Sequence, residues 1–337
     1  MQSFKMELKN KKVFVTGSGG FIGSHLLEAL VHKGCEVKAF VHYNSFNKNG
    51  WIDSLEKSII DAIEIISGDI RDAYCVKKAM KGSEVVFHLA SLIGIPYSYY
   101  SPEAYVETNI KGTLNVLQAA EEINIKKIIH TSTSEVYGTA QFVPITENHP
   151  INPQSPYAAT KAAADFLAMS FYRSFHVPVV IVRPFNTYGP RQSTRAIIPT
   201  IITQILSGAK EVKLGSLYPT RDLNFVTDTV DGFIKAAEID SSVGNIFNLG
   251  SGNEISIKEL AARVISLMGS NVEVVEDPLR KRPEKSEVER LVADYHKAKE
   301  ELHWVSLTGF EDGLVKTIDW FSDKNNMHYY KNEKYAI

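Results

Sequence analysis

A carboxylate at the end of an apolar run is the first feature of this sequence that could do chemistry. The run IKKIIH (125–130) is typical of a buried strand, and TSTSEVYG (131–138) follows it with serine and threonine hydroxyls around Glu135. Sheets of α/β proteins keep their ligand crevice at the carboxyl ends of their strands. Glu135, with Thr133 and Ser134 beside it, is therefore either a proton-transfer group or a solvated loop residue.

A tyrosine and a lysine one helical turn apart form the second candidate group. SPYAATKAAADFL (155–167) predicts a helix, because Ser155 can cap its N-terminus and Pro156 suits its first position. Tyr157 and Lys161 then lie on one face of that helix. A free tyrosine has a pKa of about 10 and is a poor base at neutral pH, but a neighbouring ammonium favours its phenolate. An exposed helix pair is the alternative, and the position of the pair downstream of the candidate acid favours chemistry.

A glycine-rich turn near the N-terminus predicts a dinucleotide site. In VFVTGSGGFIGSHLLEAL (13–30), Gly17 and Gly20 permit a tight turn and the close approach of a pyrophosphate, and Gly23 lets the helix pack closely on the strand. A glycine pattern alone is a weak signal. Here it follows a predicted strand and opens a predicted helix, which is the context that the motif requires.

The end of the second predicted strand bears on the choice of cofactor. NAD enzymes usually place an acid there for the ribose 2′-hydroxyl, and NADP enzymes an arginine for the 2′-phosphate. This chain has FVHYNS (40–45), with neither. Because no guanidinium is available, the sequence favours NAD, held through His42, Asn44 or Ser45, with NADP as the alternative.

The elements that must position these residues alternate along the first half of the chain. Near-continuous apolar runs predict strands at 12–16, 36–41, 63–66, 84–89, 126–131 and 177–184. Amphipathic stretches predict helices at 21–33, 72–81, 102–123 and 156–175. The alternation predicts a parallel sheet covered on both faces. The fold class is therefore α/β: a Rossmann-type doubly wound parallel sheet with a smaller C-terminal α/β substrate-binding domain.

In the second half of the chain, the alternation of predicted strands and helices is less regular. Helical patterns occur at 196–208, 228–239, 256–268, 294–302 and 310–322, and a short strand is predicted at 245–250. The charged segment DPLRKRPEKSEVERL (277–291) resembles a solvated connection on composition alone. We assign 1–185 plus 224–250 to the dinucleotide-binding domain, and 186–223 plus 251–330 to the domain that binds a nucleotide sugar.

Composition excludes several classes of protein. The 337 residues are 44% hydrophobic and 23% charged, with a formal net charge of −2, so there is no electrostatic footprint for nucleic acid or an anionic membrane. No apolar run approaches the roughly 20 residues of a membrane span, and the first twelve residues lack the apolar core of a signal peptide. Cys35 and Cys75 have no metal-ligand spacing, so we expect no metal, two buried free thiols and a cytoplasmic location.

Taken together, the motifs resemble the extended short-chain dehydrogenase/reductases that act on nucleotide sugars. The resemblance rests on the three glycines, Tyr157 and Lys161, TSTSEVYG, and the segments HLAS (88–91), ETNIKGTLNVL (107–117), RPFNTYGP (183–190) and RDLNFVTD (221–228). It extends to ADYHKAKEELHW (293–304). It implies a tightly bound, recycled NAD, and a homodimer paired through helices near 101–123 and 156–175.

The resemblance also implies a set of binding residues. The cofactor site is expected to contain Gly17, Gly20, Phe21, Ile22, Gly23, His42, Asn44, Ser45, Asp69, Ile70, Leu89 and Ala90, together with Tyr157 and Lys161. The nucleotide-diphosphate sugar is expected to meet Tyr97, Thr133, Asn186, Arg191, Arg221 and Arg282. Paired guanidiniums suit a diphosphate because they bind it bidentately, which favours a binding role for the charged segment 277–291.

Within this family, Glu135 separates two reactions. Epimerases commonly have small residues at the positions of Ser134 and Glu135, whereas 4,6-dehydratases have Asp-Glu or Ser-Glu, which this sequence resembles. The resemblance implies that Tyr157 takes the C4 hydroxyl proton while C4 gives up hydride, with Thr133 bonded to the C4 oxygen. Glu135 then removes the C5 proton as water leaves C6, and hydride returns to C6.

Serine at position 134 leaves one step open. Its hydroxyl is too weak an acid to protonate the leaving hydroxyl by itself. Either Glu135 carries the C5 proton to the C6 oxygen, or a water relayed by Ser134 does.

The segment IGIPYSYYSPEAYVETN (93–109) bears on the sugar. It resembles dehydratases on N-acetylglucosamine routes to nonulosonic acids, so UDP- or GDP-N-acetylglucosamine is the expected substrate. Tyr97 and Tyr99 either line the sugar pocket or simply pack. The alternatives are a C4- or C5-epimerase or an oxidoreductase of the same family and, in a different class, a non-catalytic dinucleotide sensor.

Overall fold

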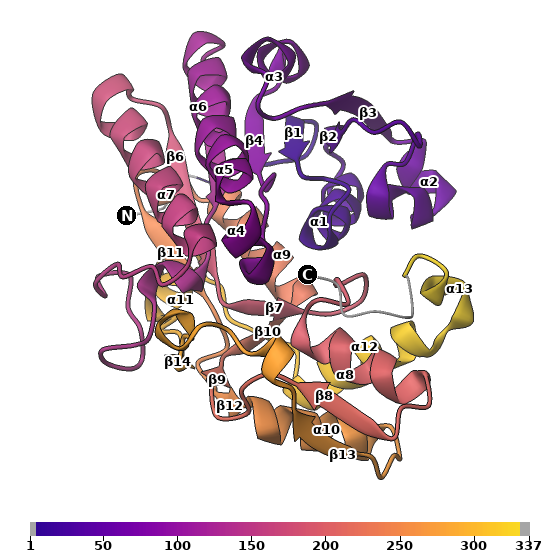
Figure 1. Ribbon diagram of the computed structural model, residues 1–337. Coiled ribbons are helices and arrows are strands. Elements are labelled where there is room, and N and C mark those ends of the chain that lie inside the picture. Colours follow the sequence, from indigo (N-terminus) through magenta and orange to yellow (C-terminus); the bar gives the residue numbers. More distant parts are fainter. Residues whose placement is uncertain (1–4, 331–337) are drawn as a thin grey trace.

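A seven-stranded parallel sheet forms the centre of the protein, which a computed structural model describes over residues 5–330 (Figure 1). Its strand order is β11-β6-β5-β4-β1-β2-β3. The strands are β1 Lys12–Thr16, β2 Glu36–His42, β3 Ile63–Gly68, β4 Val85–His88, β5 Lys127–Thr131, β6 Val179–Pro184 and β11 Ile246–Leu249. All seven lie close to their predicted positions, and the α/β Rossmann-type prediction is confirmed.

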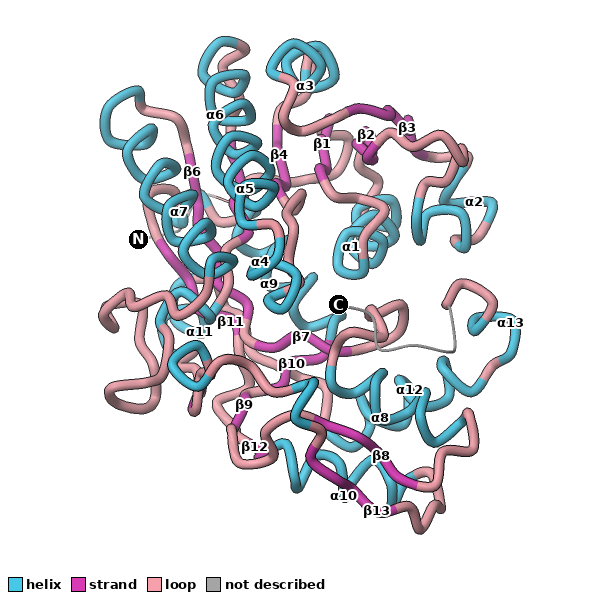
Figure 2. The backbone as a smooth tube through the Cα atoms, viewed as in Figure 1, coloured by secondary structure: helices cyan, strands magenta, loops and turns pink. Residues whose placement is uncertain are grey.

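Helices cover both faces of this sheet, as Figure 2 also shows. One layer contains α3 (Ala73–Met80), α6 (Gly112–Glu122) and α7 (Pro156–Phe175), and the other contains α1 (Phe21–His32) and α9 (Val226–Glu238). β4 and β6 are buried along their whole length because helices shield both of their faces. The carboxyl ends of the strands are therefore held rigidly.

The predicted helix 102–123 is divided in the structure. It consists of α5 (Pro102–Tyr105), a wider π-helical turn at Val106–Lys111, and α6. Asn109, in the wide turn, donates to Leu92 O and to Thr160 Oγ1, both at 3.0 Å. The turn therefore anchors the segment after β4 to α7 through a single side chain, and such turns are frequent near functional sites.

The second half of the chain adds three small sheets. β7 (Asn186–Tyr188) pairs with β10 (Leu223–Phe225), and β8 (Glu211–Leu214) pairs with β13 (Glu273–Glu276). The third sheet joins β9 Thr220–Arg221, β12 Ile255–Ser256 and β14 Arg290–Leu291. Strands of two to four residues leave no periodic signal, so the sequence did not predict them.

The helices of this half follow their predicted patterns. α8 Ile197–Leu206, α10 Ile257–Leu267 and α11 His296–Glu301 are slightly shorter than predicted, and α12 Phe310–Ser322 has the predicted bounds. The short helix α13 Lys324–Met327 was not predicted. Shorter helices are α2 Lys57–Ile60 and α4 Ile95–Tyr100, and 3₁₀ turns lie at Gly50–Ser54, Ser134–Tyr137, Asp240–Ser242, Pro278–Arg280 and Glu284–Ser286. The division into two domains stays a prediction.

Two expectations from composition differ from the structure. The segment 277–291 is not a solvated connection throughout, because Glu287 is only 9% exposed and Leu291 is fully buried. Both cysteines are free, but only Cys35 is buried, whereas Cys75 is partly exposed at the edge of α3. Charge and spacing alone do not reveal which face of a loop another segment covers.

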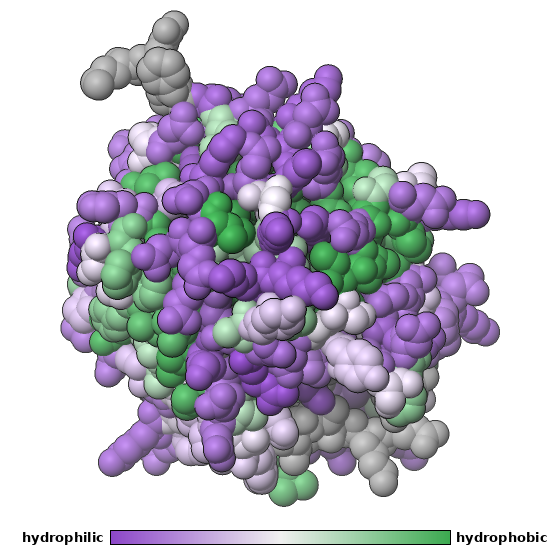
Figure 3. All heavy atoms as spheres, turned by 90° about the horizontal axis from the view of Figure 1, so that it is seen from above, coloured by the Kyte–Doolittle hydropathy of each residue, from purple (hydrophilic) through white to green (hydrophobic). Residues whose placement is uncertain are grey.

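The surface is mixed rather than dominated by one patch. Seen from above, hydrophilic side chains cover most of one face, with apolar side chains gathered in separate groups between them (Figure 3). Exposed large apolar residues include Val106 beside α6, and Phe166 and Phe175 on α7. Within residues 5–330, no helix has the length and apolar character needed to cross a membrane.

Candidate active site

A cleft of about 1070 Å³ lies at the carboxyl ends of the central strands. Its volume is at the upper end of ligand pockets, which suits a site for two large ligands. The predicted residues that line it are Gly17, Gly20, Phe21, Ile22, Gly23, His42, Asn44, Leu89, Tyr97, Thr133, Ser134, Glu135, Tyr157, Lys161, Asn186, Arg191, Arg221 and Arg282. The structure thus brings together the candidate groups for catalysis, cofactor and substrate.

The glycine-rich turn has the shape that a dinucleotide requires. Gly17 has φ of +68°, and a Cβ there would lie 2.7 Å from Ala90 N. A Cβ on Gly23 would lie 2.2 Å from Gly17 O, so only glycine lets α1 pack this closely. Gly20 precedes α1 and supplies no capping side chain, which leaves the first amides of the helix available to an anion.

Four predicted cofactor residues, Ser45, Asp69, Ile70 and Ala90, are not among the residues that line the cleft. The carboxylate of Asp69 pairs with Arg71 at 2.6 Å, and bonds from Arg71 hold the pKa of Asp69 below its usual value. Ile70 is buried in the core, and Ala90 N donates to Thr16 Oγ1 at 3.0 Å. Ser45 is exposed in the loop after β2.

Asn44 lines the cleft, but its side chain is engaged within its own loop. Its Nδ2 donates to Lys48 O at 2.7 Å, and its Oδ1 accepts from Phe46 N at 3.1 Å. The amide therefore shapes the loop at the end of β2, next to His42.

The candidate catalytic tyrosine is held at the start of α7. The helix begins as predicted, since Ser155 Oγ accepts from Ala158 N at 3.1 Å and Pro156 occupies its first turn. Burial raises the pKa of Tyr157, the hydroxyl of Thr133 opposes this, and the charge of Glu135 adds to it. The sequence suggested that a nearby ammonium would favour phenolate, but in the protein alone burial is the larger effect.

Lys161 lies one turn further along the same face. Its Nζ donates to Thr131 O at 2.6 Å, which ties α7 to the end of β5. Burial lowers the pKa of Lys161 to about 8, and the charge of Asp165 opposes this lowering. The lysine can therefore exchange its proton close to neutral pH.

A buried ion cluster behind Lys161 was missed by the sequence analysis. Asp165 Oδ2 accepts from Ser132 Oγ at 2.8 Å, and from Arg183 Nε at 3.0 Å and Nη2 at 2.9 Å. His130 Nε2 lies 3.3 Å from the other carboxylate oxygen. Burial would raise the pKa of Asp165, but its contacts with His130, Arg183 and Ser132 outweigh burial and lower it. The i, i+4, i+8 spacing of Tyr157, Lys161 and Asp165 was the signal available.

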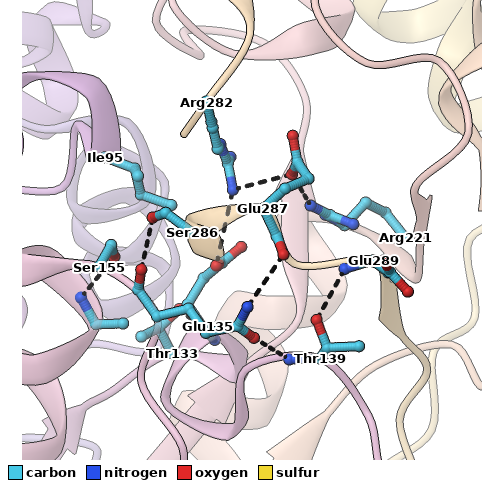
Figure 4. A network of polar contacts seen from close by, with 12 residues as sticks. Ile95, Thr133, Glu135, Thr139, Ser155, Arg221, Arg282, Ser286, Glu287 and Glu289 are labelled. Atoms are coloured by element: carbon cyan, nitrogen blue, oxygen red, sulfur yellow. Dashed lines mark hydrogen bonds and ion pairs between the residues drawn. The ribbon is translucent and has the colours of Figure 1, made fainter. Parts of the chain in front are cut away.

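Glu135 faces the cleft from a 3₁₀ turn that follows β5. Thr133 Oγ1 accepts from Glu135 N at 3.3 Å, and the glutamate is only 7% exposed. Its Oε2 lies 4.0 Å from Arg282 Nη1, and Figure 4 shows the guanidinium pointing between Glu135 and Glu287. The interpretation of Glu135 as a solvated loop residue does not fit this burial.

The two arginines predicted to bind a diphosphate meet at Glu287. Arg282 Nη1 is 3.6 Å and Arg221 Nη2 is 3.5 Å from Glu287 Oε1 (Figure 4). Arg221 is almost fully buried, and its pKa is lowered by that burial in spite of the nearby carboxylates. Glu287 was not predicted, because the charged composition of its segment indicated solvent.

A relay of hydrogen bonds positions this segment. Tyr99 Oη lies 2.6 Å from Ser286 Oγ, which donates to Gln154 O at 2.5 Å. Gln154 Nε2 in turn donates to Glu287 O at 3.1 Å. Tyr99 therefore anchors the segment that contains Arg282, whereas Tyr97 is 40% exposed and lines the cleft.

The remaining predicted substrate residues differ in how free they are. Arg191 donates to both carboxylate oxygens of Glu28 on α1, at 2.6 and 3.1 Å, so it joins two segments of the cleft wall. Among the described residues, Asn186 Oδ1 is buried without a hydrogen-bond partner, and so is Oε1 of Gln192, which was not predicted. Buried polar atoms are rarely left unpaired, so these two oxygens are suited to contact a polar ligand. Arg282 Nη1 is within ion-pair distance of Glu135 and Glu287.

The fold and this cleft together define the class of the protein as a short-chain dehydrogenase/reductase. A family model described as GDP-mannose 4,6 dehydratase matches residues 14–317. The chain therefore belongs to this family of nucleotide-sugar dehydratases and epimerases, and it is an enzyme of that family.

Individual relatives fall on both sides of the dehydratase–epimerase division. A dTDP-glucose 4,6-dehydratase of Streptomyces antibioticus is 31% identical over 92% of each chain. The solved structure of a UDP-N-acetylglucosamine 4-epimerase from Methanobrevibacter ruminantium, in complex with UDP-N-acetylmuramic acid, is 32% identical with a TM-score of 0.84, covering 93% of this chain and 98% of its own. A Bacillus cereus UDP-glucuronic acid 4-epimerase, solved with UDP-glucuronic acid and NAD, is 30% identical with a TM-score of 0.84, covering 92% of this chain and 98% of its own.

Proposed function

We propose that the protein is a 4,6-dehydratase that converts UDP- or GDP-N-acetylglucosamine to a 4-keto-6-deoxy sugar. The observation that carries the proposal is the position of Glu135, a buried carboxylate in the cleft whose charge acts on Tyr157. A 4-epimerase only has to remove and return hydride at C4, and needs no base for C5. A dehydratase must also break the C5–H bond.

The side chains divide this work between them. Tyr157 accepts the proton of the C4 hydroxyl, and Thr133 hydrogen-bonds the C4 oxygen. The ketone formed at C4 acidifies the C5 proton, which Glu135 removes while the C6 hydroxyl leaves as water. Glu135 itself, or a water held by Ser134, delivers the proton to the leaving oxygen; a hydride at C6 and a proton at C5 then complete the product. General acid–base help of this kind is worth roughly 10²–10⁴-fold in rate.

NAD is the proposed cofactor, with NADP as the alternative. The chemistry that it supplies when bound is reversible acceptance of hydride, which lets one molecule serve every turnover. Support comes from the glycine-only geometry at Gly17 and Gly23, from the uncapped N-terminus of α1, and from a similar epimerase solved with NAD. Lys161 is proposed to hold the nicotinamide ribose, and the loop at His42 and Asn44 the adenosine.

The substrate is proposed from the other half of the cleft. Arg221 and Arg282 offer two guanidiniums to a diphosphate, and Asn186, which lines the same cleft, has a buried oxygen that no described residue pairs. N-acetylglucosamine is supported by the motif 93–109 and by a similar 4-epimerase whose name gives UDP-N-acetylglucosamine. Tyr97 is proposed to line the sugar pocket.

Two properties of the whole protein are also proposed. A homodimer paired through helices near 101–123 and 156–175 would cover the exposed Val106 and Phe166, and the small exposed side chain of Ala159 on α7 permits close approach. A cytoplasmic location is consistent with two free thiols. Sedimentation of the purified protein would test the proposed homodimer.

Product analysis tests the proposed function directly. The purified protein, without added cofactor, is incubated with UDP-N-acetylglucosamine and in parallel with GDP-N-acetylglucosamine, with Tyr157→Phe as the control. We expect a product that has lost one water from at least one of the two sugars, and none from the control. Failure of both sugars to lose water would reject the proposal.

The second candidate is a nucleotide-sugar 4-epimerase. It is favoured by the similarity of this chain to the solved UDP-N-acetylglucosamine and UDP-glucuronic acid 4-epimerases. The same incubation separates the two candidates, because an epimerase gives a product of unchanged mass whose proton couplings at C4 differ from those of the substrate.

A further inference from the structure

An aromatic cluster joins the C-terminal end of the described chain to the loop after β2. The ring of Trp51 lies 5.4 Å from Trp320, 5.2 Å from Tyr329 and 5.4 Å from Tyr330, measured between centroids. Tyr330 also packs 5.3 Å from Phe321. Figure 1 shows α13, in yellow, on the same side of the molecule as α2. We call Trp51, Trp320, Tyr329 and Tyr330 the aromatic clasp.

One end of the clasp is fixed to the glycine-rich turn. Trp51 N donates to Gly19 O at 2.9 Å. A Cβ on Gly19 would lie 2.4 Å from Asn49 O, and one on Gly50 would lie 2.3 Å from Gly19 O. The segment before Trp51 therefore lies directly against the turn, with no room for a side chain between them.

The other end is fixed to the opposite wall of the cleft. Tyr330 Oη donates to Gln192 O at 2.7 Å, in the segment that follows β7. Burial raises the pKa of Tyr330, so its hydroxyl remains a donor at neutral pH. Trp51, Gln192 and Tyr330 all line the cleft together with Gly19 and Gly20. The clasp thus connects the two walls at the end of the cleft where the glycine-rich turn lies.

We infer that the aromatic clasp closes the cofactor end of the cleft and slows the release of the bound dinucleotide. The inference rests on the proposed function, in which one cofactor is recycled and benefits from staying bound. A dinucleotide seated on the glycine-rich turn could leave past the clasp only if Trp51 separated from Tyr330 or if Tyr330 separated from Gln192. The apolar rings also exclude water from the pyrophosphate end, where the amides of α1 are available.

The release rate of the dinucleotide tests this inference. Wild-type protein, Trp51→Ala and Tyr330→Phe are loaded with NADH, and its release into excess NAD is followed by the fluorescence of bound NADH. Tyr74→Ala, an exposed aromatic on α3 outside the cleft and the proposed dimer helices, is the matched control. Trp51→Ala removes three ring contacts, so release should be about tenfold faster or more. Tyr330→Phe removes one hydrogen bond, so release should be about threefold faster, and the control should match the wild type.

The possible failures are distinguishable. If the wild-type protein binds NADH and both variants release it at the wild-type rate, the clasp inference is overturned while the proposed function stands. If the wild-type protein binds neither NADH nor NADPH, the proposed function is overturned and the clasp with it. Should Trp51→Ala fail to fold, Tyr330→Phe, which keeps every ring in place, decides the question alone.

Discussion

Two buried carboxylates, Asp165 and Glu135, both act on the charge of Tyr157 and differ in how closely their partners hold them. Asp165 is 3% exposed and accepts three hydrogen bonds from Ser132 and Arg183. Glu135 is 7% exposed, and its ion pair with Arg282 is 4.0 Å long. Similar burial therefore accompanies two different arrangements: Asp165 accepts three hydrogen bonds on one carboxylate oxygen, whereas Glu135 faces the cleft with a long ion pair to Arg282.

The difference assigns different work to the two regions. In the region behind the cleft, between α7 and β6, the charged groups pair with one another, as Asp165 does with Arg183. These pairs hold Lys161 and the end of β5 in place. The region in front, between Glu135 and Glu287, holds carboxylates and guanidiniums at 3.5 to 4.0 Å, distances that a ligand can rearrange. Removing a partner from a closely bonded buried pair should lower the free energy of unfolding, whereas changing a loosely held group should lower the rate of the reaction.

The largest effect is expected for Glu135→Gln. The amide keeps the shape of the side chain but cannot accept the C5 proton, so kcat for water loss should fall by about 10²–10⁴-fold. The free energy of unfolding should change by less than about 1 kcal/mol, because one long ion pair at the cleft is lost. Steady-state kinetics and urea denaturation measure the two quantities; an active variant would remove Glu135 from the chemistry.

Asp165→Asn should have the opposite effect, with a large loss in the free energy of unfolding. It leaves Arg183, which is 4% exposed, without its counter-charge, so the free energy of unfolding should fall by about 3–5 kcal/mol. Ser132→Ala is the milder companion, since it removes one hydrogen bond and should cost about 1 kcal/mol. Urea denaturation measures the stability of both variants. If Asp165→Asn were as stable as Glu135→Gln, the proposed difference between the two carboxylates would be contradicted.

The pH dependence of stability should report the burial of Lys161. Its pKa is about 8 in the folded protein and 10.5 when unperturbed, so between these values the unfolded chain binds the proton and the folded chain does not. Stability contributed by this residue therefore rises with pH across that window, and below pH 8 the buried ammonium is a full penalty. The unfolding free energy of the wild type relative to Lys161→Met should rise by about 2–3 kcal/mol from pH 7 to 10. If this difference in unfolding free energy stayed constant or fell as the pH rose, the prediction would be contradicted.

The smallest effect is expected for Arg282→Lys. The lysine keeps a positive charge near Glu135 but loses the planar fork that suits a diphosphate. The KM for the nucleotide sugar should rise about tenfold, with a smaller change in kcat. If kcat fell while KM stayed constant, Arg282 would serve Glu135 rather than the substrate.

The sequence predicted the parts of the molecule that depend on local signals. The seven strands, α7 with its Ser155 cap, and the lining positions of Glu135, Tyr157 and Lys161 follow from apolar runs, capping residues and motif spacing. Each of these signals lies within a few residues of the element that it specifies. The motif on which the proposed function depends, Ser-Glu after Thr133, was also visible in the sequence.

What the sequence did not show depends on partners that are distant along the chain. Asp165 meets Arg183 only because α7 packs beside β6, and Trp51 meets Tyr330 only because the segment after α13 returns to the cleft. Glu287 lies in a segment whose composition indicates solvent, yet hydrogen bonds from Gln154 hold that segment against the cleft. Neither charge nor periodicity encodes such contacts, so tertiary packing had to reveal them.

The most direct test of the central claim, that Glu135 makes this cleft a dehydratase site, is solvent exchange at C5. Wild-type enzyme would turn over UDP-N-acetylglucosamine, or the GDP sugar, in D₂O, and proton NMR and mass spectrometry would locate deuterium in the product. The account predicts a 4-keto-6-deoxy sugar with solvent deuterium at C5, formed without added cofactor and lost in Glu135→Gln. A product of unchanged mass, altered at C4 and carrying no deuterium, would contradict it and identify a 4-epimerase.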